Sequence, residues 1–86
     1  MPDYEEAYYN LGAAYMNKGM LDEAIAHFKR AVTIRPGYVK AHYGLGAALY
    51  SRGDFKSAIV HLDRAGKLGY SVNPALMEAL KPYRYP

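Results

Sequence analysis

Residues 5–38 read EEAYYNLGAAYMNKGMLDEAIAHFKRAVTIRPGY, and residues 39–72 repeat the length and the pattern as VKAHYGLGAALYSRGDFKSAIVHLDRAGKLGYSV. The two segments carry the same amino acid at 12 of 34 aligned positions. A fixed period of roughly 20–50 residues indicates stacked units, because one such unit cannot bury its apolar face alone. We therefore expect two copies of one structural unit. The identical pairs are Ala7/Ala41, Tyr9/Tyr43, Leu11/Leu45, Gly12/Gly46, Ala13/Ala47, Ala14/Ala48, Gly19/Gly53, Ala24/Ala58, Ile25/Ile59, His27/His61, Arg30/Arg64 and Ala31/Ala65.

Within each unit, apolar and small residues recur at the spacing of an α-helix. The first half of each unit has them at i, i+3, i+4 and i+7, and the second half continues the same periodicity. Each unit is therefore predicted to be a hairpin of two helices. The first-helix positions are Tyr8, Leu11, Gly12 and Tyr15, then His42, Leu45, Gly46 and Leu49; the second-helix positions are Ala24, Phe28 and Ala31, then Ala58, Leu62 and Ala65.

The ends of the first helices carry recognisable signals. Asp3 followed by Glu6 is the pattern of a capping box, which predicts a helix from about Tyr4 to Asn17. Gly19 and Gly53 each follow a basic residue and suit the left-handed conformation that ends many helices.

Later boundaries are marked by proline, glycine and asparagine. Asp54 is placed to cap the helix that follows it, and Pro36-Gly37 should stop the second helix, since proline lacks an amide hydrogen. A fifth helix should begin with Asn73 as its cap and Pro74 in its first turn, and should end by Pro82.

Two glycines interrupt the predicted first helices. Each of Gly12 and Gly46 lowers helix propensity by about 1 kcal/mol relative to alanine, so a packing reason is expected. We expect them to face Ala24 and Ala58, where small residues would let two helices approach closely.

This pattern resembles the tetratricopeptide repeat family, which places an aromatic residue, Leu-Gly, a second aromatic, Ala, a third aromatic, Ala and a final Pro at fixed spacing. The resemblance covers residues 5–72. The first unit matches nearly throughout, and the second departs at four positions. The first unit carries Tyr8, Leu11, Gly12, Tyr15, Ala24, Phe28, Ala31 and Pro36; the second keeps Leu45, Gly46, Ala58 and Ala65 but has His42, Leu49, Leu62 and Tyr70 at the other sites.

The resemblance implies an all-α fold, a right-handed superhelical stack of two antiparallel hairpins plus a fifth, solvating helix. It implies one domain over residues 1–86, with repeats at 5–38 and 39–72 and a capping helix at 73–82. Family members bind proteins or peptides, so the expected function is a non-catalytic interaction module that acts as a scaffold. A self-assembling oligomerisation unit, and hence a homo-oligomer, is the alternative, because two repeats are fewer than a stable array usually needs.

The resemblance also implies a concave face formed by the first helix of each pair. An acidic residue of the ligand is expected near Lys40, Lys81 or Arg84, and tyrosine is common in binding surfaces. Glu6 is also expected to point into this face, and Arg84 is a further candidate for it. A plainer interpretation stays open, in which some of its tyrosines only pack against neighbours. The predicted peptide-binding residues are Tyr9, Ala13, Met16, Lys40, Tyr43, Ala47, Tyr50, Met77 and Lys81.

The composition narrows the possible partners and locations of the protein. The net charge of +3 comes from dispersed basic residues in the second half, which does not favour nucleic acid as a partner. The chain has no cysteine and no apolar run long enough to span a bilayer, and it begins with acidic residues, so we expect a soluble, cytoplasmic protein, or a soluble piece of one, with no membrane partner.

No catalytic or metal-binding pattern is found. His27 and His61 hold equivalent places, but stacked repeats put such residues roughly 10 Å apart, which is too far for a shared zinc ion. The serines lack recognisable His and Asp partners, and no phosphate-binding loop occurs. We therefore expect no enzyme activity, no metal and no cofactor.

Overall fold

The structure is a computed structural model that describes residues 3–85, and these residues form five α-helices and one short 3-10 helix. The predicted all-helical fold and the predicted first helix are confirmed. Residues 1, 2 and 86 of the predicted domain lie outside the described residues. The helices are α1 (Tyr4–Asn17), α2 (Leu21–Ile34), α3 (Val39–Arg52), α4 (Phe55–Lys67), α5 (Pro74–Leu80) and η1 (Lys81–Tyr83).

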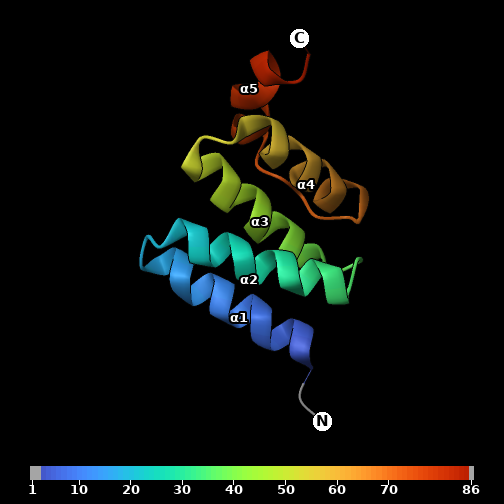
Figure 1. Cartoon of the computed structure of the whole chain (residues 1–86). Helices are drawn as coiled ribbons and strands as arrows, with labels where there is room; N and C mark the ends of the chain where they lie inside the picture. Colours follow the sequence, from blue (N-terminus) through green and yellow to red (C-terminus); the bar gives the residue numbers. More distant parts are fainter. Residues whose placement is uncertain (1–2, 86) are drawn as a thin grey trace.

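The helices pack in the order of the chain. α1 packs on α2, α2 on α3 and α3 on α4, while α1 also touches α3. Figure 1 shows the α1–α2 hairpin lying against the α3–α4 hairpin, with the two ends of the chain at opposite ends of the stack. The result is an elongated body of 43 × 26 × 20 Å. The interface between the two hairpins is formed mainly by α2 and α3, with a smaller contact between α1 and α3.

The glycine and asparagine signals at the helix ends are confirmed. Gly19 and Gly53 have φ angles of 75° and 93°, the left-handed region that glycine tolerates best. The side chain of Asn73 accepts a hydrogen bond from the backbone N of Ala75 at 2.9 Å, with Pro74 in the first turn. α5 ends at Leu80 and the chain continues as η1.

The two aspartate caps were predicted only partly correctly. Asp3 and Asp54 do stand at the N-cap positions, but neither side chain makes a capping hydrogen bond. The capping box with Glu6 is therefore absent. The Asp54 carboxylate instead accepts a hydrogen bond from Nε of Arg52 at 2.6 Å.

Alanine and a few large side chains fill the core between the helices. Phe28 is 2% exposed and lies where α1, α2 and α3 meet. A Cβ atom added to Gly12 of α1 would lie 2.7 Å from Cδ1 of Phe28, and one added to Gly44 of α3 would lie 2.7 Å from its Cζ. Two glycines therefore make room for one ring. The fully buried large side chains other than this ring are Leu45, Leu62 and Leu80.

This arrangement adds to the expected role of the helix glycines. At Gly12 the atoms nearest to an added Cβ belong to the Phe28 ring, a contact that was not predicted from the sequence. At Gly46 a Cβ would lie 2.6 Å from Cγ of Leu62 and 3.3 Å from the carbonyl oxygen of Ala58. The predicted close approach to Ala58 is present, but the nearest side chain is that of Leu62.

Candidate peptide-binding face

The predicted binding residues fall into two groups by burial. The apolar members are half-buried, and except for Ala47 they pack against the core, while the two lysines are exposed. We call the apolar members the tyrosine face: Tyr9, Ala13, Met16, Tyr43, Ala47, Tyr50 and Met77.

Tyr9 is held between two aromatic rings. Its ring centroid lies 5.7 Å from that of Phe28 and 5.4 Å from that of Tyr38, which comes from the loop between α2 and α3. Tilted rings at these separations attract each other beyond the gain from area burial. The Tyr9 side chain is therefore fixed by the core on one side and by a loop on the other.

Tyr43 has the equivalent arrangement in the second hairpin. Its centroid lies 4.5 Å from that of Tyr70, a residue of the loop after α4. Each hairpin thus supplies a loop tyrosine that rests on the tyrosine of its own first helix. The partner rings Tyr38 and Tyr70 were not predicted from the sequence, because they lie outside the helices whose periodicity carried the prediction.

Tyr50 belongs to a chain of three rings at the other end of α3. It lies 5.4 Å from Phe55 at the start of α4, and Phe55 lies 4.4 Å from Tyr83 of η1. This contact joins the C-terminal segment to the second hairpin. The open interpretation that some tyrosines pack against neighbours is thus correct for all three, and each remains half-exposed at the same time.

A shallow hollow lies where the starts of α1 and α3 meet. It has a volume of about 360 Å³ and is lined by Glu6, Arg35, Gly37, Tyr38, Val39 and Lys40. The structure thus brings together Glu6 and Lys40, two positions that the sequence analysis assigned to one face. The guanidinium of Arg35 lies 5.0 Å from the Tyr38 ring centroid, and burial together with nearby Glu6 raises the pKa of the Tyr38 hydroxyl.

The basic groups expected to meet an acidic ligand differ in availability. Arg84 donates two hydrogen bonds, of 2.8 and 2.9 Å, to the Asp63 carboxylate, and these bonds hold the pKa of that carboxyl below its usual value. Lys81 forms an exposed ion pair with Glu78 at 3.3 Å. Within residues 3–85, Lys40 makes no ion pair, so it is the basic side chain best placed to receive an acidic group.

A sequence model of the family described as tetratricopeptide repeat matches residues 5–38. Residues 5–38 therefore match the pattern of one tetratricopeptide repeat. The matched segment runs through α1 and α2 to Tyr38, so the repeat includes the loop tyrosine that covers Tyr9. A search of curated proteins finds no match.

The second hairpin has nearly the same helix lengths as the first. α3 has the same length as α1, and α4 is one residue shorter than α2. Tetratricopeptide repeats are in general modules of protein–protein interaction. Over residues 3–85, no helix combines the length and the apolar character that a bilayer span requires.

The histidine at the aromatic position of the second hairpin has a packing role. His42 is 6% exposed; its Nε2 donates to the carbonyl oxygen of Pro36 at 2.7 Å, and its Nδ1 accepts from Nδ1 of His61 at 3.3 Å. His27 is occupied elsewhere, with Nδ1 donating to the carbonyl oxygen of Glu23 at 2.8 Å. Burial, followed by the neighbouring His42, lowers the pKa of His61.

Proposed function

We propose that this chain binds a peptide or a protein segment on the tyrosine face, and that it acts as a scaffold without catalysing a reaction. In this proposal residues 5–38 and 39–72 are the two repeats of one domain, and residues 73–82 close its C-terminal end. The observation that carries the proposal is a half-exposed aromatic surface whose rings are already fixed by partners.

Pre-positioned rings favour binding for an entropic reason. Ordering a mobile side chain at an interface costs roughly 0.5–1.5 kcal/mol, and a ring held by its neighbours has little freedom left to lose. Tyr9 and Tyr43 each pack against the tilted ring of a loop tyrosine and offer their remaining area and their hydroxyls to a ligand. Ala13 and Ala47 add little bulk beside them, so a ligand backbone can approach closely.

The charge near the start of α3 indicates which kind of ligand residue would bind there. Lys40 and Arg35 line the hollow with Glu6, which leaves a net positive charge among its lining residues. An acidic ligand residue would be attracted to this end of the face. Because both basic groups are exposed, the expected gain is modest and would weaken with added salt.

A matched pair of charge reversals tests this proposal. Lys40 and Lys56 are both exposed second residues of their helices, so Lys40→Glu and Lys56→Glu change the charge and the helix start in the same way. Wild-type and variant chains would be immobilised, exposed to lysate of the source cells and analysed by quantitative mass spectrometry. We expect Lys40→Glu to reduce retention of the main partner several-fold and Lys56→Glu to leave it unchanged.

The tyrosines are tested separately because they also support the fold. A triple variant, with Tyr9, Tyr43 and Tyr50 changed to alanine, is first checked for helicity and cooperative unfolding. The folded variant should lose the partner that the wild type retains. Equal retention by the folded triple variant, or equal loss with Lys40→Glu and Lys56→Glu, would contradict the proposal and favour contact through another surface.

A further inference from the structure

The outer face of α1, formed by Ala7, Leu11, Ala14 and Lys18, has an exact counterpart one repeat later on α3. Moving by 34 residues along the chain leads to Ala41, Leu45, Ala48 and Arg52, which are the same two alanines, the same leucine and another basic residue. The surroundings of the two sets differ completely. Leu45 and both alanines of α3 are 0% exposed, whereas Leu11 is 45% exposed and its two alanines are exposed as well.

The difference in burial has one structural source. Each set lies on the first helix of a hairpin whose own second helix is present, as α2 for α1 and as α4 for α3. What α3 has in addition is the preceding hairpin, whose α2 packs against it. The residues that α2 covers on α3 are therefore left uncovered on α1, and four of the α1 residues, Leu11, Ala14, Tyr15 and Lys18, line a hollow of about 160 Å³.

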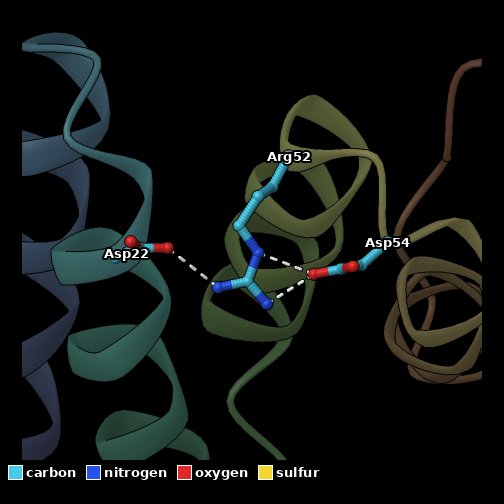
Figure 2. A network of polar contacts seen from close by, with 3 residues as sticks. All are labelled: Asp22, Arg52 and Asp54. Carbon is cyan, nitrogen blue, oxygen red and sulfur yellow. Dashed lines mark hydrogen bonds and ion pairs between the residues drawn. The ribbon is translucent and has the colours of Figure 1, made fainter.

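The charged end of the α2–α3 contact shows what a helix packed on α1 would carry. Figure 2 shows Arg52 between two carboxylates, with its Nη1 donating to Asp22 of α2 at 2.9 Å. Lys18 occupies the place of Arg52 on α1 and has no ion pair within residues 3–85. A helix that covers α1 as α2 covers α3 would therefore bring an acidic residue in its first turn to Lys18.

We propose that the outer face of α1 is a second docking surface, which takes an amphipathic helix of a partner protein in the way that α3 takes α2. A second copy of this chain fits less well. The helix equivalent to α2 in such a copy is α4, which has Lys56 where α2 has Asp22, so it would set one lysine against Lys18. α4 is also joined to the C-terminal segment through the Asp63–Arg84 pair.

The α1 face also selects the size of the residue at the centre of the partner helix. Phe28 of α2 fits against α3 because Gly44 leaves room for its ring, and the equivalent residue of α1 is Asn10. On α1, the Cβ of Asn10 takes up the space that lies free beside Gly44 on α3 and that the Phe28 ring fills there. The partner helix therefore carries an aliphatic residue shorter than phenylalanine at that position, six residues after its acidic residue.

The test uses the full chain and a synthetic probe. The probe is a blocked peptide with the sequence of residues 19–36 and Phe28→Leu, titrated into labelled protein and followed by NMR. We expect signals of Ala7, Leu11 and Ala14 to shift at peptide concentrations up to the millimolar range, since a single short helix is marginally stable alone. The unchanged Phe28 peptide should bind several-fold more weakly, and Asn10→Gly in the protein should remove that difference.

Variants on the face and away from it make the test decisive. Leu11→Glu should weaken binding at least tenfold, and Val60→Glu, at a 63% exposed apolar residue of α4, should not change it. Lys18→Glu should weaken binding roughly two- to five-fold, and an Asp22→Lys peptide should restore it. Ala14→Glu serves as a second variant of the face if Leu11→Glu fails to unfold cooperatively.

Other outcomes overturn the inference. Shifts confined to another surface, or equal affinity for the wild type and Leu11→Glu, would remove α1 as the docking site. Dilution-dependent shifts of the α1 signals without peptide, together with a doubled molar mass, would show that a second copy occupies the face. Neither result bears on the tyrosine face, whose tests use different residues.

Discussion

Replacing Gly44 with alanine should destabilise the protein, although alanine is the better helix former. The reason is the Phe28 ring, which packs against the Gly44 backbone across the interface between the hairpins. A Cβ on Gly44 would lie 2.7 Å from Cζ and 2.8 Å from Cε1 of Phe28. Carbon atoms pack best at roughly 3.5–4.0 Å, so the ring or α3 must move by about 1 Å. Phe28 is almost fully buried and has little space to yield.

The expected magnitude follows from two opposing effects. Overpacking of a core costs about 1–3 kcal/mol, and replacing a helix-interior glycine by alanine gains about 1 kcal/mol. Gly44→Ala should therefore lower the free energy of unfolding by about 1 kcal/mol. Gly66 of α4 is the matched control, because a Cβ there meets nothing within 4 Å. Gly66→Ala should raise the free energy of unfolding by about 1 kcal/mol.

Urea denaturation followed by circular dichroism measures both changes. In thermal unfolding followed by the same signal, the two variants should shift Tm in opposite directions, by roughly 4–8 °C each for a domain of this size. In a Phe28→Leu background the steric conflict is relieved, and Gly44→Ala should become neutral or stabilising. A stabilised Gly44→Ala variant, or a loss that persists unchanged beside Phe28→Leu, would refute the packing argument.

Three further predictions concern the polar contacts. Burial lowers the pKa of His61, so the unfolded state binds a proton at this side chain more readily, and the free energy of unfolding should fall as the pH drops below about 6.5. In unfolding curves recorded at a series of pH values, His61→Gln should remove this dependence on pH. The pKa of Asp63 is also lowered, because its carboxylate accepts hydrogen bonds from Arg84, so the stability that this pair contributes is present at neutral pH and is lost below about pH 4. Asp63→Asn should reduce the free energy of unfolding at pH 7 by up to about 1 kcal/mol, and a loss of equal size at pH 2.5 would contradict this prediction. Arg52→Ala removes an exposed contact with Asp22 and should lower the free energy of unfolding only slightly, and still less in high salt; a large, salt-independent loss in urea titrations would contradict it.

Local signals predicted the local features of this fold correctly. The first helix, the left-handed Gly19 and Gly53, and the Asn73 cap all depend on residues within one turn of each other. The Asp54 cap was also a local prediction, and it was wrong in part. Arg52, two residues earlier, pairs with the Asp54 carboxylate, and this carboxylate makes no capping hydrogen bond.

Contacts between hairpins were beyond the reach of periodicity. The role of Gly44 depends on Phe28, sixteen positions earlier in the preceding hairpin. The His42–His61 hydrogen bond joins α3 to α4, and neither histidine stands out in the sequence as a partner of the other. The repeat nevertheless contains a usable signal, because residues that are identical one period apart should have the same surroundings, and Leu11 and Leu45 do not.

The positions of the candidate tyrosines were predicted from the sequence, and the loop rings that pack against them were not. The sequence placed Tyr9 and Tyr43 at equivalent positions, and the structure keeps both half-exposed. Their loop partners, Tyr38 and Tyr70, lie where no helical period applies. The second of these occupies the proline position of the repeat, so an apparent departure from the family pattern supplies a contact.

Site-specific photocrosslinking tests the central claim of a peptide-binding tyrosine face most directly. A benzophenone amino acid is placed at Tyr43 of one chain and at Val60 of another, and each chain is irradiated in lysate of the source cells. The account predicts that a partner is crosslinked at Tyr43 and that Lys40→Glu in the same chain reduces the yield, while Val60 captures only background. Equal crosslinking from both positions, or a Tyr43 adduct indifferent to Lys40→Glu, would contradict it.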